Sequence, residues 1–175
     1  MLCSRRVIVI LMGVVGAGKS TVGSLLAQRL GWQFADADAF HSPANVEKIR
    51  HGISLTDADR APWLAALHDA ITKWNAGEEN VVLACSALKR KYRDELSAGL
   101  IRFVYLKGSR ELILARLRSR HGHFAGESIL DTQFADLEEP EDAVTVSAAP
   151  PPEAIVDEIL TRLKPELAYP DAAKK

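Results

Sequence analysis

Short apolar runs alternate along this chain with longer segments whose apolar residues recur every three or four positions. Residues 7–12, 81–85 and 101–106 form the clearest runs and are almost wholly apolar, which is typical of strands buried between helices. Two shorter strands are expected at about residues 32–36 and 143–146. Strands that alternate with helices in this way predict an α/β domain with a mostly parallel sheet.

The first two helices are marked by their ends as well as by their spacing. Residues 22–30 carry valine and leucine at helical intervals, and Gly31 stands where a C-terminal cap is expected. Ser42 and Pro43 have the residue types of an N-cap and a first helical position. A short helix is therefore predicted to run from there to about Gly52.

A longer helix follows, and one of its faces is apolar. That face is outlined by Trp63, Leu64, Leu67, Ile71 and Trp74. The pair Ala76-Gly77 closes the helix, and Pro62 is compatible with it only in the first turn, where its missing N–H has no intrahelical partner to lose.

Further helices are expected in the second half of the chain. A polar segment over residues 86–95 and one helix separate the strands expected at 81–85 and 101–106, and the next helix begins after Ser109, which has the residue type of an N-cap. A short helix is predicted at about residues 128–137, and another over about residues 153–163, after the rigid run of prolines at 150–152.

Composition narrows the range of folds and functions. The 175 residues are 47% apolar, which is enough for one substantial core but short for two domains. We expect one domain over residues 1–164 and a frayed tail over residues 165–175. Lys plus Arg total 22 against 23 acidic residues, a net charge of −1, so the balance of charge favours neither a nucleic-acid partner nor a membrane surface.

Cysteine usage and the apolar runs bear on the compartment. Cys3 and Cys85 lie far apart and outside any Cys/His cluster, which argues against a zinc site or a disulfide framework and favours a cytoplasmic protein with reduced thiols. The run at residues 7–12 is too short for a secretory signal, and no later run has membrane-spanning length.

The strongest motif is Gly13-Val14-Val15-Gly16-Ala17-Gly18-Lys19-Ser20, which fits the P-loop pattern between a predicted strand and a predicted helix. Backbone N–H groups of such a loop cradle phosphates, Lys19 reaches the β and γ phosphates, and Ser20 offers its hydroxyl to Mg²⁺. The residues expected to bind ATP are Gly13, Val14, Gly16, Ala17, Gly18, Lys19, Ser20 and Thr21.

Two carboxylates follow the second predicted strand. Asp36 and Asp38 lie two residues apart at the carboxyl edge of the sheet, where open α/β folds bind ligands. Aspartates in loops are most often turn formers, but next to a P-loop a functional interpretation is favoured. We assign Asp36 to water-mediated coordination of Mg²⁺ and Asp38 to the base that deprotonates an attacking hydroxyl.

Basic residues provide candidates for an anionic acceptor. Arg60, Lys89 and Arg93 are expected to bind it, because a guanidinium fork matches a carboxylate. The alternative for each residue is a solvated helix surface with no ligand.

A second basic group lies on the helix after Ser109. Arg116 is expected to contact the nucleotide. Arg120 is expected to neutralise transition-state charge and belongs to a lid segment over about residues 118–138. His41 and His123 are candidate substrate ligands, although a lone histidine is more often a structural hydrogen bonder.

Several longer stretches resemble the thermoresistant gluconokinase family. The resemblance is carried by residues 36–41, 52–64, 85–94, 122–124, 133–134 and 137–140, and it covers residues 7–163 in order. It implies a three-layer α/β/α P-loop fold similar to shikimate and nucleoside monophosphate kinases, with a parallel sheet in the order 2-3-1-4-5.

The resemblance also implies an activity. This is transfer of the γ-phosphoryl group of ATP to the 6-hydroxyl of D-gluconate, in gluconate catabolism that feeds the pentose phosphate pathway. It implies substrate contacts from Trp63 and Ser86, and a homodimer. Val15 replaces a small polar residue usual in the family, and Ala125-Gly126 stands where Met-Pro often occurs. The second difference is expected to affect nucleotide affinity or turnover rather than substrate identity.

Two other functions are compatible with a P-loop. One is a kinase for shikimate or another small hydroxy acid, because the P-loop and the paired aspartates are shared by that wider group. The other is a non-catalytic nucleotide switch or a motor-type NTPase coupled to nucleic acid. The sequence contains neither an Asn-Lys-x-Asp guanine-recognition motif nor a basic stripe with interleaved aromatics, so the kinase interpretation is favoured.

Overall fold

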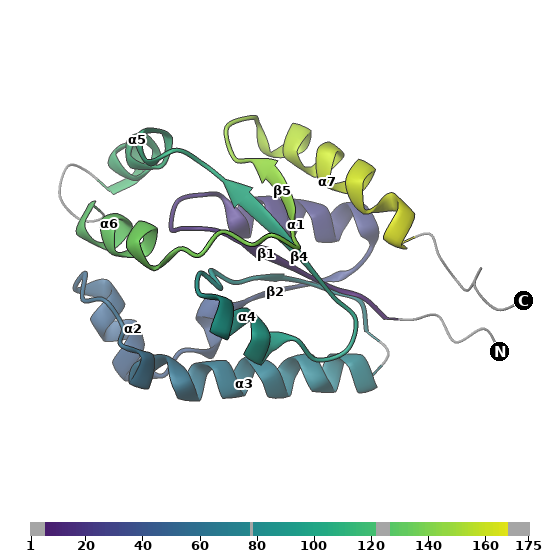
Figure 1. Cartoon of the computed structure of the whole chain (residues 1–175), viewed down its shortest axis with the longest axis horizontal. Helices are drawn as coiled ribbons and strands as arrows, with labels where there is room; N and C mark the ends of the chain where they lie inside the picture. The colour runs from purple at the N-terminus through teal and green to yellow at the C-terminus, as the bar shows by residue number, and fades with distance from the viewer. Residues whose placement is uncertain (1–5, 78, 122–126, 168–175) are drawn as a thin grey trace, which may run out of the picture.

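A five-stranded parallel sheet forms the centre of the molecule (Figure 1). The computed structural model describes residues 6–77, 79–121 and 127–167. The strands, in the order β2-β3-β1-β4-β5, are β1 Ile8–Met12, β2 Gln33–Asp36, β3 Val81–Ala84, β4 Ile101–Lys107 and β5 Val144–Ser147. This confirms the predicted fold class and the strand order 2-3-1-4-5.

Helices cover both faces of the sheet. They are α1 Lys19–Leu30, the 3₁₀ turn η1 Ala37–Phe40, α2 Pro43–Arg50, α3 Asp57–Ala76, α4 Arg90–Leu96, α5 Arg110–His121, α6 Glu127–Asp136 and α7 Pro152–Leu167. In Figure 1, α3 and α4 lie below the sheet, and α1 and α7 lie above it. The three layers follow from strands that are apolar on both faces.

Two hydrophobic cores result from the alternation of side chains along the central strand. Val9 and Leu11 of β1 belong to the core shared with α1, α5, α6 and α7. Ile8 and Ile10 belong to the other core, which is shared with α3 and α4. Because all five residues of β1 are buried, the loop that follows this strand is held on a rigid base.

Most of the predicted helix ends are confirmed. Gly31 adopts the left-handed conformation at the C-cap of α1, with φ of 67°, and the Ser42 side chain accepts a hydrogen bond from the Asn45 N–H at 3.2 Å. Ser109 caps α5 by accepting from the Leu112 N–H at 3.2 Å.

The expected place of Pro62 is wrong. A reciprocal capping box starts α3 at Asp57: the Asp59 N–H donates to Thr56 Oγ1 at 3.2 Å, and the Thr56 N–H donates to Asp59 Oδ2 at 2.9 Å. Pro62 therefore lies in the second turn, where its ring removes one helical hydrogen bond. The buried face of α3, which includes Trp63 and Leu67, keeps the helix in place because packing outweighs that loss.

Removing the cap of α3 is expected to destabilise the protein. Thr56→Ala should lower the free energy of unfolding by about 1 kcal/mol, measured from the midpoint of urea unfolding at unchanged slope. Thr161→Ala is the matched control, because Thr161 lies inside α7 and its hydroxyl donates to the Asp157 carbonyl oxygen within the same helix. An equal loss in both variants would contradict the capping role.

The carboxylate in this cap stays ionised at low pH. Hydrogen bonds from Lys48 and Thr56 lower the pKa of Asp59 from 3.8 to about 2. The contribution of Asp59 to stability is therefore complete above about pH 4 and is lost as the pH falls through about 2.

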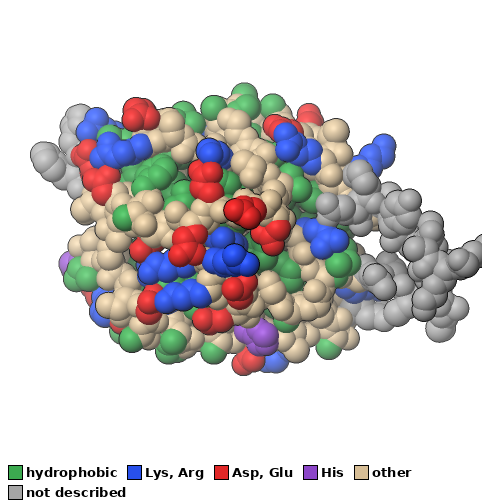
Figure 2. Space-filling model, in the orientation of Figure 1, with side chains coloured by type: hydrophobic (Ala, Val, Ile, Leu, Met, Phe, Trp, Pro, Cys, Tyr) green, Lys and Arg blue, Asp and Glu red, His purple; other side chains and the backbone are tan. Residues whose placement is uncertain are grey.

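Charges of both signs are interspersed over the face drawn in Figure 2. No helix within the described ranges is both long and apolar enough to cross a membrane. The carboxyl ends of β1, β2 and β3 meet at one edge of the sheet, because these strands are parallel neighbours. This edge brings the P-loop and the two aspartates together.

Candidate active site

The P-loop folds tightly between β1 and α1. Gly13 has φ of 147°, and a Cβ there would lie 2.9 Å from the Leu106 carbonyl oxygen. Gly16 has φ of 80°, and a Cβ would lie 3.1 Å from a Leu117 methyl group. Both positions therefore require glycine. The N-terminus of α1 has no side-chain cap, so its first N–H groups are available to an anion.

Lys19 lies half-buried beneath this loop. Its Nζ donates to the Val14 carbonyl oxygen at 3.0 Å, and it lines a cleft of about 310 Å³ at the sheet edge. Desolvation lowers the pKa of Lys19, while the nearby Asp38, Cys85 and Asp36 act in the opposite direction. The ammonium group is thus held in a place where it interacts strongly with an incoming phosphate.

Ser20 and Asp36 are joined directly. Ser20 Oγ donates to Asp36 Oδ2 at 2.5 Å, and the Asp38 N–H donates to Asp36 Oδ1 at 3.0 Å. A hydroxyl and a carboxylate side by side suit Mg²⁺, which prefers oxygen ligands and retains water molecules. Among the described residues, no group of three or more His, Cys, Asp or Glu could hold a metal ion.

The cleft brings most of the predicted residues together. Those that line it are Gly16, Gly18, Lys19, Ser20, Thr21, Asp36, Asp38, His41, Arg60, Trp63, Ser86 and Arg120. Asp38 and Lys19 therefore border the same space, although they come from different strand ends. His123 lies outside the described residues.

His41 and Trp63 form one wall of the cleft. Their rings stack with centroids 4.6 Å apart, and Trp63 Nε1 donates to the Ala37 carbonyl oxygen at 2.7 Å. Nδ1 of His41 is buried without a hydrogen-bond partner in the described part of the chain. Desolvation lowers the pKa of His41 and Arg60 lowers it further, against the opposing charge of Asp38, so the imidazole is neutral at pH 7.

Three of the predicted basic ligand residues do not line the cleft, and neither do Gly13, Val14 and Ala17 of the P-loop. Arg93 is only 7% exposed, and its Nη1 donates to the carbonyl oxygens of Ala87 and Leu88 at 3.0 and 2.9 Å. Arg116 Nη2 donates to the Ala148 carbonyl oxygen at 2.7 Å. Lys89 lies against the carboxylates of two aspartates. The structure thus places all three against protein groups, and their contacts with ligands stay predictions.

Known proteins resemble this chain in sequence and in architecture. The family model described as shikimate kinase matches residues 15–164. The gluconokinase of Gluconobacter oxydans is 44% identical, and the alignment covers 90% of this chain and 91% of that protein. The thermoresistant gluconokinase of Escherichia coli is 41% identical, and the alignment covers 90% of this chain and 93% of that protein. The chain belongs to the gluconokinase family.

A solved structure extends the likeness to three dimensions. The crystal structure of a gluconokinase from Sinorhizobium meliloti superposes with a TM-score of 0.83 at 43% identity, covering 94% of this chain and 95% of the other. The family resemblance stated from the sequence is therefore confirmed.

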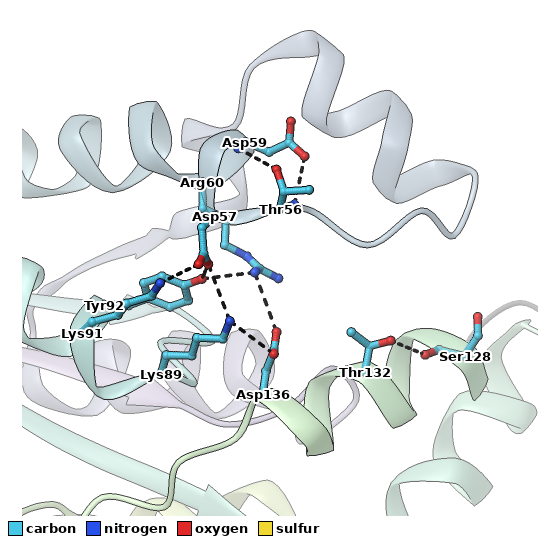
Figure 3. Close-up of polar contacts among 10 residues, drawn as sticks. All are labelled: Thr56, Asp57, Asp59, Arg60, Lys89, Lys91, Tyr92, Ser128, Thr132 and Asp136. Carbon is cyan, nitrogen blue, oxygen red and sulfur yellow. Dashed lines mark hydrogen bonds and ion pairs between the residues drawn. The ribbon is translucent and has the colours of Figure 1, made fainter.

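Sequence reasoning missed a polar cluster on the α3 and α4 side of the cleft (Figure 3). Arg60 Nη1 donates to the Tyr92 hydroxyl at 3.2 Å, and that hydroxyl donates to Asp57. Lys91 Nζ also donates to Asp57, at 2.5 Å. The hydrogen bond from Lys91, and after it the one from the Tyr92 hydroxyl, hold the pKa of Asp57 well below its ordinary value. In the sequence, Asp57 and Tyr92 are 35 residues apart, and no local pattern links them.

Helix α6 contributes two further residues to which the sequence analysis assigned no role in the site. Gln133 Oε1 accepts a hydrogen bond from the Val15 N–H of the P-loop at 2.6 Å. Asp136 lies 3.4 Å from Lys89 Nζ and 3.7 Å from Arg60 Nη1. Both residues line the cleft. The segment was expected to be part of a lid, and nothing in its linear pattern indicates which side chains face inward.

Proposed function

We propose that this chain transfers the γ-phosphoryl group of ATP to the 6-hydroxyl of D-gluconate, giving 6-phospho-D-gluconate and ADP. The observation that carries the proposal is the convergence of Lys19, Ser20, Asp36 and Asp38 on one cleft in a chain of the gluconokinase family. A phosphate site and a candidate base that face the same space are what phosphoryl transfer to an alcohol requires.

The nucleotide side follows from the P-loop. The N-terminus of α1 and the loop N–H groups bind the phosphates, and Lys19 adds a positive charge next to them. Ser20 and the hydrogen-bonded Asp36 would hold Mg²⁺, Asp36 through water. When bound, the ion would offset the negative charge that develops on the phosphates during transfer.

The acceptor side uses the opposite wall of the cleft. Asp38 orients the attacking hydroxyl and accepts its proton as the bond to phosphorus forms. The neutral His41, stacked on Trp63, offers a nitrogen to a sugar hydroxyl, and Ser86 adds a hydroxyl at the end of β3. Arg60, together with the neighbouring Lys89, supplies the positive charge for the carboxylate of the sugar acid.

A coupled ADP-release assay with a panel of acids tests the proposal. Purified protein with MgATP is expected to turn over gluconate much faster than shikimate or other hydroxy acids. Transfer to shikimate alone would favour the second candidate, which the match to the shikimate kinase family model supports. ATP binding without transfer to any acid would refute both. A homodimer and a cytoplasmic location stay predictions.

Loss of the Ser20 hydroxyl is expected to weaken metal use. Ser20→Ala should raise the free Mg²⁺ needed for half-maximal rate by about tenfold or more, because a ligand of the ion and its link to Asp36 are lost together. Ser24→Ala is the control, since Ser24 is exposed one turn later on α1. The same Mg²⁺ dependence in wild type and Ser20→Ala would argue against the metal assignment.

A further inference from the structure

Three cations surround one aromatic ring beside the acceptor wall of the cleft (Figure 3). Arg60, Lys89 and Lys91 lie 5.6, 5.8 and 5.4 Å from the centre of the Tyr92 ring. Two carboxylates, Asp57 and Asp136, face these cations. The cluster formed by these six residues therefore holds one more positive than negative charge.

The two carboxylates of the cluster are held very differently. Asp57 accepts hydrogen bonds from the Tyr92 hydroxyl and from Lys91 Nζ, and it does not line the cleft. Asp136 faces Lys89 and Arg60 at 3.4 and 3.7 Å, which is longer than a well-formed hydrogen bond. Of the two, Asp136 is the carboxylate that can leave at small cost.

The position of Asp136 in its own helix also indicates that this carboxylate is weakly held. It is the last residue of α6, where the helix dipole disfavours a negative charge. Its attachment to the cluster therefore rests on Arg60 and Lys89 rather than on the helix. Asp136 and Arg60 both line the cleft, whereas Asp57 does not, so an anion in the cleft approaches the same cation that Asp136 contacts.

We propose that Asp136 is an internal counter-ion that holds the carboxylate place of the acceptor and is displaced when a sugar acid binds. The inference deepens the proposed function and rests on it for the class of ligand. The acceptor carboxylate replaces Asp136 next to Arg60 and Lys89, and the charge balance of the cluster is preserved. Asp136 thus lowers the affinity of the cleft for sugar acids, because an acid binds only if its carboxylate competes successfully with Asp136 for the cations.

The decisive measurement is equilibrium binding of gluconate by calorimetry. Asp136→Asn is expected to bind gluconate about three- to tenfold more tightly than wild type, because the variant no longer competes for the two cations. Asp136→Ala, which removes the polar atoms of the side chain, should act in the same direction. Sorbitol, an uncharged polyol with the same chain of hydroxyls, should gain no affinity from either change.

Asp131→Asn is the matched control. Asp131 lies on the same helix, but it pairs with Arg110 at 2.8 Å on an exposed surface, so its replacement should leave gluconate binding unchanged. Affinity for ATP reports on the placement of α6, because Gln133 on this helix holds the Val15 N–H of the P-loop. It is expected to be the same in all these variants.

The outcomes separate this inference from the proposed function. Equal or weaker gluconate binding by both Asp136 variants, including no binding in any of the proteins, overturns the counter-ion role. Weaker binding would mean that Asp136 positions Arg60 or contacts the substrate itself. Tighter binding without phosphorylation of gluconate by any of the proteins would instead overturn the proposed function and support the counter-ion role.

Discussion

Asp38→Asn is expected to lower kcat for gluconate phosphorylation by about 10² to 10⁴, the range for loss of a positioned general base. Asparagine has nearly the same shape, and the backbone N–H of residue 38 can still donate to Asp36. The amide cannot accept the proton of the attacking hydroxyl, so binding of ATP should change little while the rate of transfer falls. Initial rates at saturating ATP and gluconate measure the effect.

Asp69→Asn provides the control for a general loss of charge, because Asp69 is exposed on α3 and lies outside the cleft. Its kcat should equal that of wild type. If Asp38→Asn also kept the wild-type kcat, Asp38 would not be the base. Transfer would then depend on positioning and on the electrostatic contribution of Lys19 and Mg²⁺, which a loose phosphoryl-transfer transition state permits.

Arg120→Ala is expected to lower kcat by about 10³ to 10⁵, as removal of a transition-state arginine does in related phosphoryl transfers. Arg120 comes from the end of α5 and lines the cleft together with the P-loop residues. Its guanidinium can neutralise charge on the moving phosphoryl group, which is greatest in the transition state. The effect should therefore appear in single-turnover rates far more than in the affinity for ATP.

The control for Arg120 is Arg118→Ala on the same helix. Arg118 is exposed and contacts Glu127 at 3.4 Å, a surface pair of small energetic value. Near wild-type rates are expected from this variant. A decrease of less than tenfold in Arg120→Ala, or a similar decrease in both variants, would exclude the transition-state role.

Local signals in the sequence were enough for the α/β class and for half of the site, whereas the strand order was implied only by the family resemblance. Glycines at 13 and 16 and the lysine and serine that follow them lie within one short segment of the chain, and the paired aspartates lie within another, so spacing fixes the relative positions inside each segment. Helix caps such as Gly31 and Ser42 are likewise local hydrogen-bonding units. The error at Pro62 arose because a proline was weighed as a helix start, whereas the capping box six residues earlier set the true beginning.

The acceptor side could be predicted only as a set of residue types. From the sequence, Arg60, Lys89 and Arg93 were equivalent candidates for an anion. In the structure Arg60 lines the cleft, Arg93 turns inward to two carbonyl oxygens, and Lys89 faces aspartates from two other helices. Helical spacing shows which residues share a face, but it does not show what the neighbouring helix places opposite them.

The sequence by itself therefore determined the strand-loop-helix unit that binds phosphate, the alternation of elements that gives a parallel sheet, and the presence of two carboxylates at the sheet edge. Only the tertiary structure decided which charges meet across the cleft, and it brought Asp136 of α6 to Arg60 of α3, residues 76 positions apart. Motifs within one loop are specified by short-range backbone geometry, whereas contacts between helices depend on how the whole core packs.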